Sequence, residues 1–173
     1  MKIIDPHLHL FNLKQGEYHW LKADNAPFWP DKELINKNFS EMNLQLGAPL
    51  ELAGFVHIEA GFDNKQPWRE LVFLEEMSLE QTRSKPFRAI ATINLALSNQ
   101  KFSESLEKLA AFNSFIGVRH ILDEQALSLL TNKQVLNNFK ILNSFTKDTN
   151  QSLVFETQLA LSKHAPVNAL CEV

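Results

Sequence analysis

Short apolar runs alternate with longer amphipathic stretches along the chain. Each run is rich in Ile, Val, Leu or Phe and has the length of a buried β-strand. The runs predict five strands, at residues 3–12, 53–61, 87–96, 115–122 and 153–158. Strands that are apolar on both faces and separated by helices are typical of a parallel sheet covered by helices. The pattern therefore predicts an α/β fold, built as a single domain over residues 1–173.

The stretches between the strands show helical spacing. Apolar residues three or four positions apart predict helices over 68–83 and 133–145. Ser103 is expected to cap another helix, a short helix is expected near 40–46, and Pro166 fits the first turn of a final helix. No glycine-rich phosphate loop follows the first strand, which favours a barrel-type arrangement over a nucleotide-binding doubly wound sheet.

Polar residues gather where the predicted strands end. In parallel α/β folds the carboxyl ends of the strands lie at one edge of the sheet, and that edge holds the ligand. We therefore expect five polar clusters to converge on one site. They are His7 with His9, His57 with Glu59, Thr92 with Asn94, Arg119 with His120, and Glu156 with Gln158.

The first strand carries the most distinctive cluster, Asp-Pro-His-Leu-His. Successive side chains of a strand point to opposite faces, so Asp5, His7 and His9 are expected on one face and Ile4 and Leu8 on the other. Imidazole is the commonest protein ligand for zinc, so two imidazoles one pleat apart, beside a carboxylate, predict half of a divalent metal site. The alternative is a surface strand whose histidines face water.

The connection between the first two strands, residues 13–52, is long, polar and aromatic. A connection of this length inside a compact domain is usually a lid or a substrate wall. The alternative is a structural role, in which Trp20, Phe28 and Trp29 cover the open end of the core.

Composition narrows the classes of function. The 173 residues are 45% hydrophobic and 21% charged, as in an ordinary globular protein, and their net charge is -3. A negative net charge without a basic stripe argues against nucleic acid and anionic membranes as partners. The single cysteine, Cys171, cannot form an intrachain disulfide, and no apolar run is long enough to span a bilayer. We expect a soluble, cytoplasmic protein that acts on a small molecule.

Four short motifs follow one another along the chain: Asp-x-His-x-His from Asp5, Tyr-His-Trp-Leu from Tyr18, His-x-Glu-Ala from His57, and Gly-Val-Arg ending at Arg119. In this order the chain resembles the amidohydrolase-related TIM-barrel proteins, in the branch that contains sugar-lactone and pyrone-dicarboxylate lactonases. The resemblance runs through nearly the whole chain. It implies a partial TIM barrel, with about five of the eight β/α units.

The resemblance also implies a metal-dependent or metal-assisted hydrolase, in which water attacks a cyclic ester or amide-like carbonyl. In the wider superfamily His7 and His9 would bind a divalent ion such as zinc or manganese. In the lactonase branch the metal is sometimes dispensable, and the same histidines would orient water or substrate.

The resemblance implies roles for residues of the pocket wall as well. Arg119 would be catalytic, binding a substrate carboxylate or polarising the carbonyl, and Trp20, His57 and Glu59 would be substrate-binding residues. The alternative for Arg119 is an ion pair with Glu59 or Glu156, and the alternative for His57 is a hydrogen-bonded core histidine. His120 has no expected role and is placed toward the helices.

The chain departs from the family in its length. A complete barrel takes about 250 residues, and the family's sixth-strand histidine and eighth-strand aspartate have no counterpart here. That aspartate is the expected general base, so the general base is missing from this truncated chain. The first and fifth strands are each expected to keep an unpaired edge, through which two copies could form a homodimer. The alternative function is a non-catalytic barrel remnant or assembly partner that keeps only a metal or ligand half-site.

Overall fold

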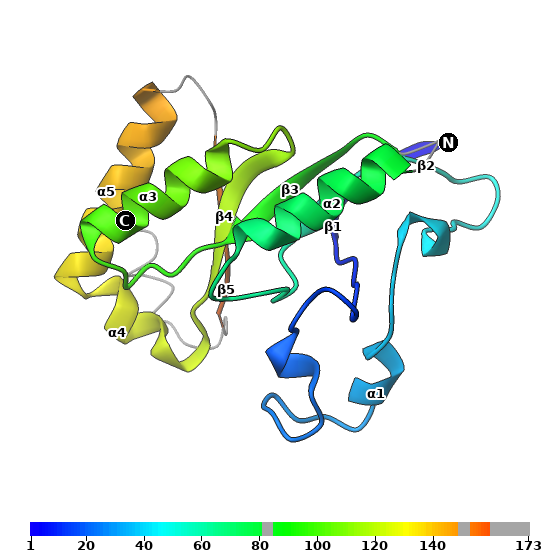
Figure 1. Cartoon of the computed structure of the whole chain (residues 1–173), viewed down its shortest axis with the longest axis horizontal. Coiled ribbons are helices and arrows are strands. Elements are labelled where there is room, and N and C mark those ends of the chain that lie inside the picture. Colours follow the sequence, from blue (N-terminus) through cyan, green and yellow to red (C-terminus); the bar gives the residue numbers. More distant parts are fainter. Residues whose placement is uncertain (81–84, 149–152, 160–173) are drawn as a thin grey trace.

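The structure is a computed structural model that describes residues 1–80, 85–148 and 153–159. Five parallel strands form one sheet in the order β1-β2-β3-β4-β5, which curls into a half-barrel (Figure 1). The strands are β1 (Lys2–Leu8), β2 (Glu51–Ile58), β3 (Phe87–Thr92), β4 (Phe115–Ile121) and β5 (Val154–Gln158). Each strand pairs with the next in the chain, so the α/β class and the parallel sheet are confirmed.

Helices connect the strands and cover one face of the sheet (Figure 1). The three longest are α2 (Trp68–Glu80), α3 (Asn99–Ala110) and α5 (Lys133–Asp148). Shorter elements are α1 (Lys32–Ile35), α4 (Ala126–Leu130) and the 3-10 turns His19–Leu21, Glu41–Asn43 and Asp123–Gln125. Within the described ranges, none of the helices has the length and apolar character of a membrane span.

The core lies between the sheet and the long helices, with α3 in contact with α2, β4 and α5. On α3 the buried residues are Phe102, Leu106 and Leu109, at the spacing of one helix face. Each such side chain contributes about 1.5–3 kcal/mol when it is fully buried. Their buried partners on the strands and on α2 include Phe55, Leu71, Leu74, Ala89, Ala91, Phe115 and Val118.

Several predicted boundaries are corrected by the structure. The helix expected to start at Ser103 begins one turn earlier, at Asn99, because Ser98 holds the N-cap position and its carbonyl accepts the Phe102 N–H at 2.8 Å. The helix expected near 40–46 is a single 3-10 turn, Glu41–Asn43. The final helix expected near Pro166 lies outside the described residues.

The first strand is less regular than its sequence predicts. Its pairing with β2 shifts register between Ile3 and Ile4 and again between Asp5 and Leu8. Pro6 lies within the second shift and has no N–H to donate to the sheet. As a result strict alternation fails, and Ile4, expected on the apolar face, is 68% exposed.

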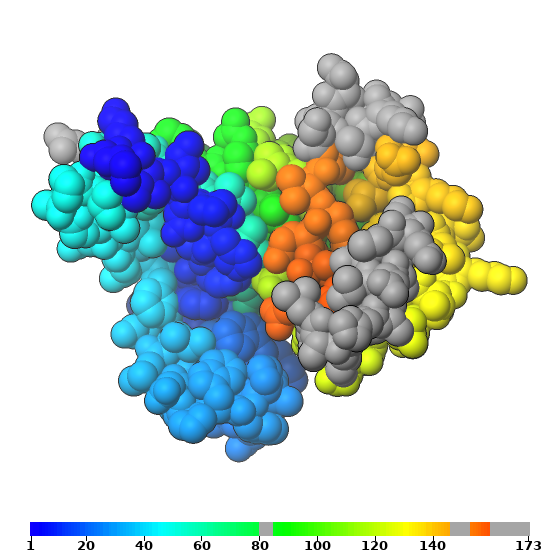
Figure 2. Space-filling model, turned by 180° about the vertical axis from the view of Figure 1, so that it is seen from behind, coloured from blue at the N-terminus to red at the C-terminus, as the bar shows by residue number. Residues whose placement is uncertain are grey.

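Within the described ranges the two outer strands of the sheet have no outer neighbour, as the sequence predicted. Among the described residues, β1 pairs only with β2 and β5 only with β4. Figure 2 shows β1 in dark blue and β5 in orange at the surface of the same face. Ile4 of β1 and Val154 of β5, which is 44% exposed, present apolar side chains to solvent on these outer strands.

Gly117 of β4 lets β5 approach closely. Gly117 is paired with Val154, and a Cβ atom at Gly117 would lie 2.2 Å from the Val154 carbonyl oxygen. No side chain fits in that space, so the pairing of β4 with β5 explains why a glycine occupies position 117 of the Gly-Val-Arg motif.

Candidate functional site

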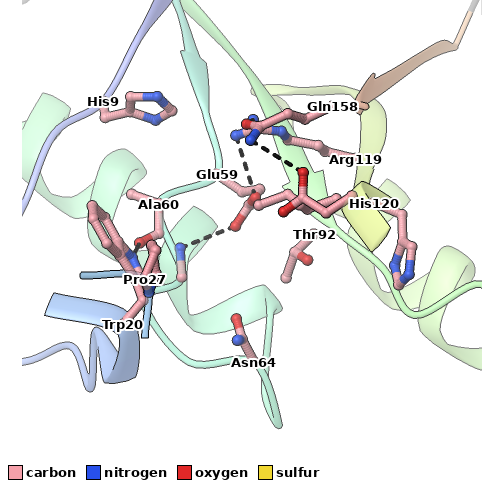
Figure 3. Close-up of a pocket in the computed structure, with 13 residues that line it drawn as sticks. His9, Trp20, Pro27, Glu59, Ala60, Asn64, Thr92, Arg119, His120 and Gln158 are labelled. Carbon is pink, nitrogen blue, oxygen red and sulfur yellow. Dashed lines mark hydrogen bonds and ion pairs between the residues drawn. The ribbon is translucent and has the colours of Figure 1, made fainter. Parts of the chain in front are cut away.

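A cavity of about 450 Å³ opens at the carboxyl ends of the strands (Figure 3). Every strand end contributes at least one polar lining residue, and these include His9, Glu59, Thr92, Arg119 and Gln158. The sequence predicted that these ends would converge, and the structure brings them together. The remaining lining residues are Trp20, Pro27, Ala60, Gly61, Asn64, His120, Ile121 and Asp123.

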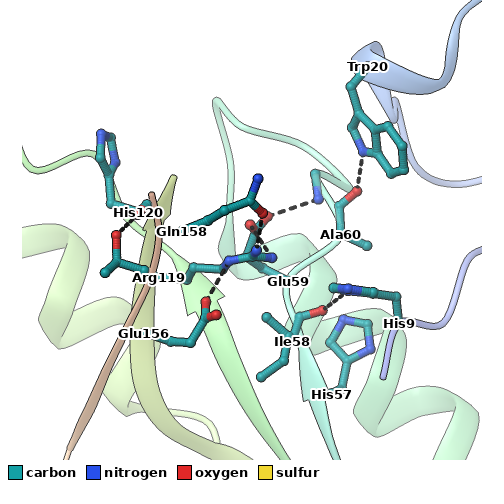
Figure 4. A network of polar contacts seen from close by, with 12 residues as sticks. His9, Trp20, His57, Ile58, Glu59, Ala60, Arg119, His120, Glu156 and Gln158 are labelled. Carbon is teal, nitrogen blue, oxygen red and sulfur yellow. Dashed lines mark hydrogen bonds and ion pairs between the residues drawn. The ribbon is translucent and has the colours of Figure 1, made fainter. Parts of the chain in front are cut away.

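Arg119 is the centre of a polar network that joins three strands (Figure 4). Its Nη1 lies 3.5 Å from Oε1 of Glu59, and its Nη2 donates to Oε1 of Gln158 at 3.1 Å. Its Nε lies 2.5 Å from Oε2 of Glu156, but the N–H is not aligned with that oxygen, so this contact is an ion pair without a hydrogen bond. The ion-pair alternative for Arg119 is therefore present, with both carboxylates as partners.

The network leaves Arg119 with unused donors. Each terminal nitrogen of a guanidinium carries two N–H groups, and only one partner for each lies within hydrogen-bonding distance among the described residues. Arg119 is 6% exposed and lines the cavity. The second N–H groups can therefore donate to an oxygen atom of a ligand, while two carboxylates compensate the positive charge.

Glu59 is a buried carboxylate at the cavity wall. One oxygen, Oε2, accepts the N–H of Gly61 at 3.0 Å, and the other faces Arg119. Burial, together with the nearby charge of Glu70, raises the pKa of Glu59 to about 7, although the charge of Arg119 opposes the shift. A carboxyl group with this pKa both accepts and releases a proton near neutral pH.

One ring nitrogen of His9 has no hydrogen-bond partner among the residues that the structure describes. Its Nδ1 lies 2.8 Å from the carbonyl oxygen of Ile58, and because a carbonyl only accepts, Nδ1 carries the proton and Nε2 keeps its lone pair. Burial, with smaller contributions from the charges of His57, His7 and Arg119, lowers the pKa of His9 to about 4, although the hydrogen bond to Ile58 opposes the shift. His9 is therefore neutral at pH 7 and can act as a ligand or a base.

The predicted metal ligands are neighbours, but they form only half of a site. The ring centroids of His7 and His9 are 5.1 Å apart, and His7 is exposed rather than at the cavity wall. Asp5 accepts the backbone N–H of His7 at 2.9 Å. Within the described part of the chain there is no group of three or more His, Cys, Asp or Glu side chains that could hold a metal ion. Two imidazoles fit a metal only in part, since zinc sites use three or four protein ligands.

His57, expected at the pocket wall, lies instead in the core. It is 1% exposed, its Nδ1 accepts the N–H of Leu10 at 3.2 Å, and its Nε2 therefore donates to Oε1 of Glu70 at 3.0 Å. The same Glu70 oxygen accepts the N–H of Ala60 at 2.8 Å. Both ring nitrogens are used within the protein, which agrees with the alternative of a hydrogen-bonded core histidine.

Trp20 forms an aromatic wall of the cavity, opposite Arg119 (Figure 3). Its indole Nε1 donates to the carbonyl of Ala60 at 2.7 Å. Gly61 has a φ of 71°, and a Cβ atom there would lie 2.9 Å from the Trp20 ring, so a glycine is needed on both counts. The ring of Trp29 stacks on Trp20 with a centroid distance of 6.0 Å. The long connection thus supplies a wall of the pocket, whereas Phe28, expected to cover the core, is 70% exposed.

Among the lining residues, Pro27, Asn64 and Asp123 belong to none of the predicted polar clusters, and His120 was expected to face the helices. His120, placed toward the helices by alternation, lines the cavity because it lies at the strand end, and its Nδ1 is 2.9 Å from the Ile93 carbonyl. Asp123 lies two residues after the end of β4, so its position close behind a strand was an available signal. Pro27 and Asn64 lie in loops that carry no such signal.

Comparisons with protein families, with curated proteins and with solved structures found no match to this chain.

Proposed function

We propose that this chain carries the substrate pocket of a lactonase-like hydrolase, with a half-barrel that corresponds to part of a TIM barrel. The observation that carries the proposal is Arg119, which is buried at the cavity, fixed by Glu59, Glu156 and Gln158, and left with N–H donors for a ligand oxygen. Fixed donors aimed at a carbonyl oxygen stabilise the negative charge that develops there when water attacks.

The pocket favours a neutral, oxygen-rich ring. Glu156, together with the ionised form of Glu59, already compensates the charge of Arg119, so an anionic substrate gains little from this arginine. The apolar wall of Trp20 lies opposite the polar side of the cavity (Figure 3). A flat cyclic ester would contact that wall with its ring while its carbonyl oxygen accepts from Arg119.

Glu59, a carboxyl group that lines the cavity beside Arg119, would take the proton. In the proposed step a water oxygen bonds to the ester carbonyl carbon, and Glu59 accepts the proton that this water gives up. The bond between that carbon and the ring oxygen then breaks, and Glu59 returns the proton to the departing oxygen. The pKa of about 7 supports this role, because it suits both halves of the transfer.

In the proposed reaction a divalent ion would only assist the attack on the carbonyl. His9 would hold zinc or manganese through Nε2, with His7 as the second ligand and water or substrate completing the shell. When bound, such an ion would polarise the carbonyl. The arginine and glutamate roles do not depend on it.

The test is hydrolysis of a panel of neutral and anionic lactones by the purified chain, with and without added zinc or manganese. Arg119→Met and Glu59→Gln are each expected to lower kcat/KM at least 100-fold. Arg88→Met and Glu51→Gln are matched controls, since both residues are exposed on neighbouring parts of the sheet. Activity that is absent, or that survives Arg119→Met, would overturn the proposal.

The open edges favour a second candidate, a barrel remnant or assembly partner without catalysis. β1 and β5 each lack an outer neighbour among the described residues, and Ile4 is exposed on the first of them. Unpaired edges recruit further strands, and a second copy would supply them in a homodimer. Self-association in a chain that shows no lactone hydrolysis would favour this candidate.

A further inference from the structure

Lys32 is a buried lysine in the long connection, outside the site described above. It is 5% exposed, although lysine is almost never buried without a partner. It begins α1, a helix of only four residues, where a positive charge is unfavourable to the helix dipole. Helix formation therefore does not explain this residue.

The ammonium group of Lys32 is surrounded by backbone carbonyls. Its Nζ donates to the carbonyl oxygens of Lys22 at 2.8 Å, Asn25 at 2.6 Å and Pro27 at 3.3 Å. An ammonium has three N–H donors, so each has an acceptor. The charge also lies 5.6 Å from the ring of Phe28 and 5.7 Å from that of Trp29, at distances typical of cation–π contacts.

The ammonium group of Lys32 is linked to a wall of the cavity through one of its three carbonyl partners and through a neighbouring ring. Pro27, which supplies one of them, lines the cavity itself. Trp29, beside the ammonium, stacks on Trp20, which also lines the cavity. The loop between residues 22 and 32 has little regular structure of its own, so it owes its shape to contacts such as these.

We propose that Lys32 is the positioning residue for this wall. Its ammonium acts as a fixed cation around which residues 22–27 wrap, and this holds Pro27 and Trp20 against the cavity. The inference does not depend on the proposed hydrolysis, because it concerns the shape of the wall for any ligand.

The first test is amide hydrogen exchange of Lys32→Met, which keeps most of the side-chain volume and removes the charge. Exchange within residues 22–32 is expected to rise at least tenfold, and the Trp20 indole N–H resonance is expected to move. Amides of β2, β3 and β4 should keep their protection. Lys22→Met is the matched control, because its side chain is 56% exposed on the same loop. Equal exchange in the two variants would overturn the proposal.

The second test is chemical rescue of Lys32→Ala, which remains informative if Lys32→Met fails to fold. Ethylammonium fits the space left by the side chain and offers three N–H donors, whereas tetramethylammonium has the charge and no donors. Ethylammonium chloride is expected to restore loop protection at least fivefold over the same concentration of tetramethylammonium chloride. Equal effects of the two salts would overturn the proposal, since hydrogen bonds to the carbonyls would then not matter. A chain unfolded in both salts would also overturn it, since Lys32 would then support the whole fold rather than this wall.

Discussion

The carboxylate of Glu59 and the guanidinium of Arg119 meet across 60 residues of chain, with 3.5 Å between Oε1 and Nη1. The arginine does not keep Glu59 strongly acidic, because burial and the charge of Glu70 outweigh it and raise the pKa to about 7. Glu156, the third carboxylate near this network, acts in the same direction. The pair therefore combines a fixed positive group with a carboxyl that titrates near neutrality.

This pairing predicts how stability depends on pH. The usual pKa of Glu59 is 4.5 and its pKa in the folded state is about 7, so between these values the folded chain binds more protons than the unfolded chain. The contribution of Glu59 to the free energy of unfolding is therefore highest below pH 4.5 and falls as the pH rises toward 7. The loss is on the order of 3 kcal/mol.

Urea denaturation between pH 4.5 and 8 measures this slope. Glu59→Gln is expected to remove the Glu59 contribution and to flatten the curve, whereas Glu51→Gln, at an exposed position on the same strand, should leave the slope unchanged. A Glu59→Gln curve parallel to that of the wild type would contradict the raised pKa.

Metal binding should depend chiefly on His9. Its Nδ1 proton is held by the Ile58 carbonyl, which leaves Nε2 free to coordinate. After loading with zinc or manganese, we expect elemental analysis to show bound metal in the wild type and none in His7→Ala/His9→Ala. His9→Ala alone is expected to lower the affinity for the metal at least tenfold. His19→Ala, at an exposed position away from the pair, is the control. Equal metal content in all four proteins would rule out this half-site.

Loss of the Glu70 carboxylate should destabilise the fold. Glu70→Ala leaves two buried donors without an acceptor, namely Nε2–H of His57 and the N–H of Ala60. Each unsatisfied buried donor costs roughly 1–3 kcal/mol, so we expect the free energy of unfolding to fall by about 2–4 kcal/mol in urea denaturation. Glu76→Ala, exposed on the same helix, should change it by less than about 0.5 kcal/mol. Similar values for both variants would show that the buried contacts contribute little.

The exposed edge of β1 should govern self-association. Ile4 is 68% exposed on that edge, and a lysine at an edge position opposes strand pairing between molecules. Sedimentation velocity over a range of concentrations is expected to show self-association of the wild type that Ile4→Lys weakens at least fivefold. Leu79→Lys, at an exposed position on α2, is the control. A wild type that stays monomeric at every concentration would refute the homodimer.

The sequence by itself determined the elements and their order. The apolar runs predicted the five parallel strands, and the helical spacing predicted α2 and α5 closely, because both patterns reflect which side of a local element is buried. The polar residues at the strand ends predicted the site as well, since parallel strands place their ends at one edge. Where local rules were incomplete, as at Ser103 and Ile4, the prediction was wrong by one turn of helix or one face of a strand.

Only the tertiary structure decided what the polar side chains contact. The His-x-Glu-Ala motif places His57 and Glu59 close together in the chain. It does not show that His57 forms a hydrogen bond with Glu70, or that Glu59 lies beside Arg119. Lys32 has no sequence signal at all, because its partners are backbone carbonyls brought to it by the path of the loop. Periodicity is a property of neighbouring residues, whereas hydrogen bonding, burial and pKa depend on groups that are distant in the chain and adjacent only after folding.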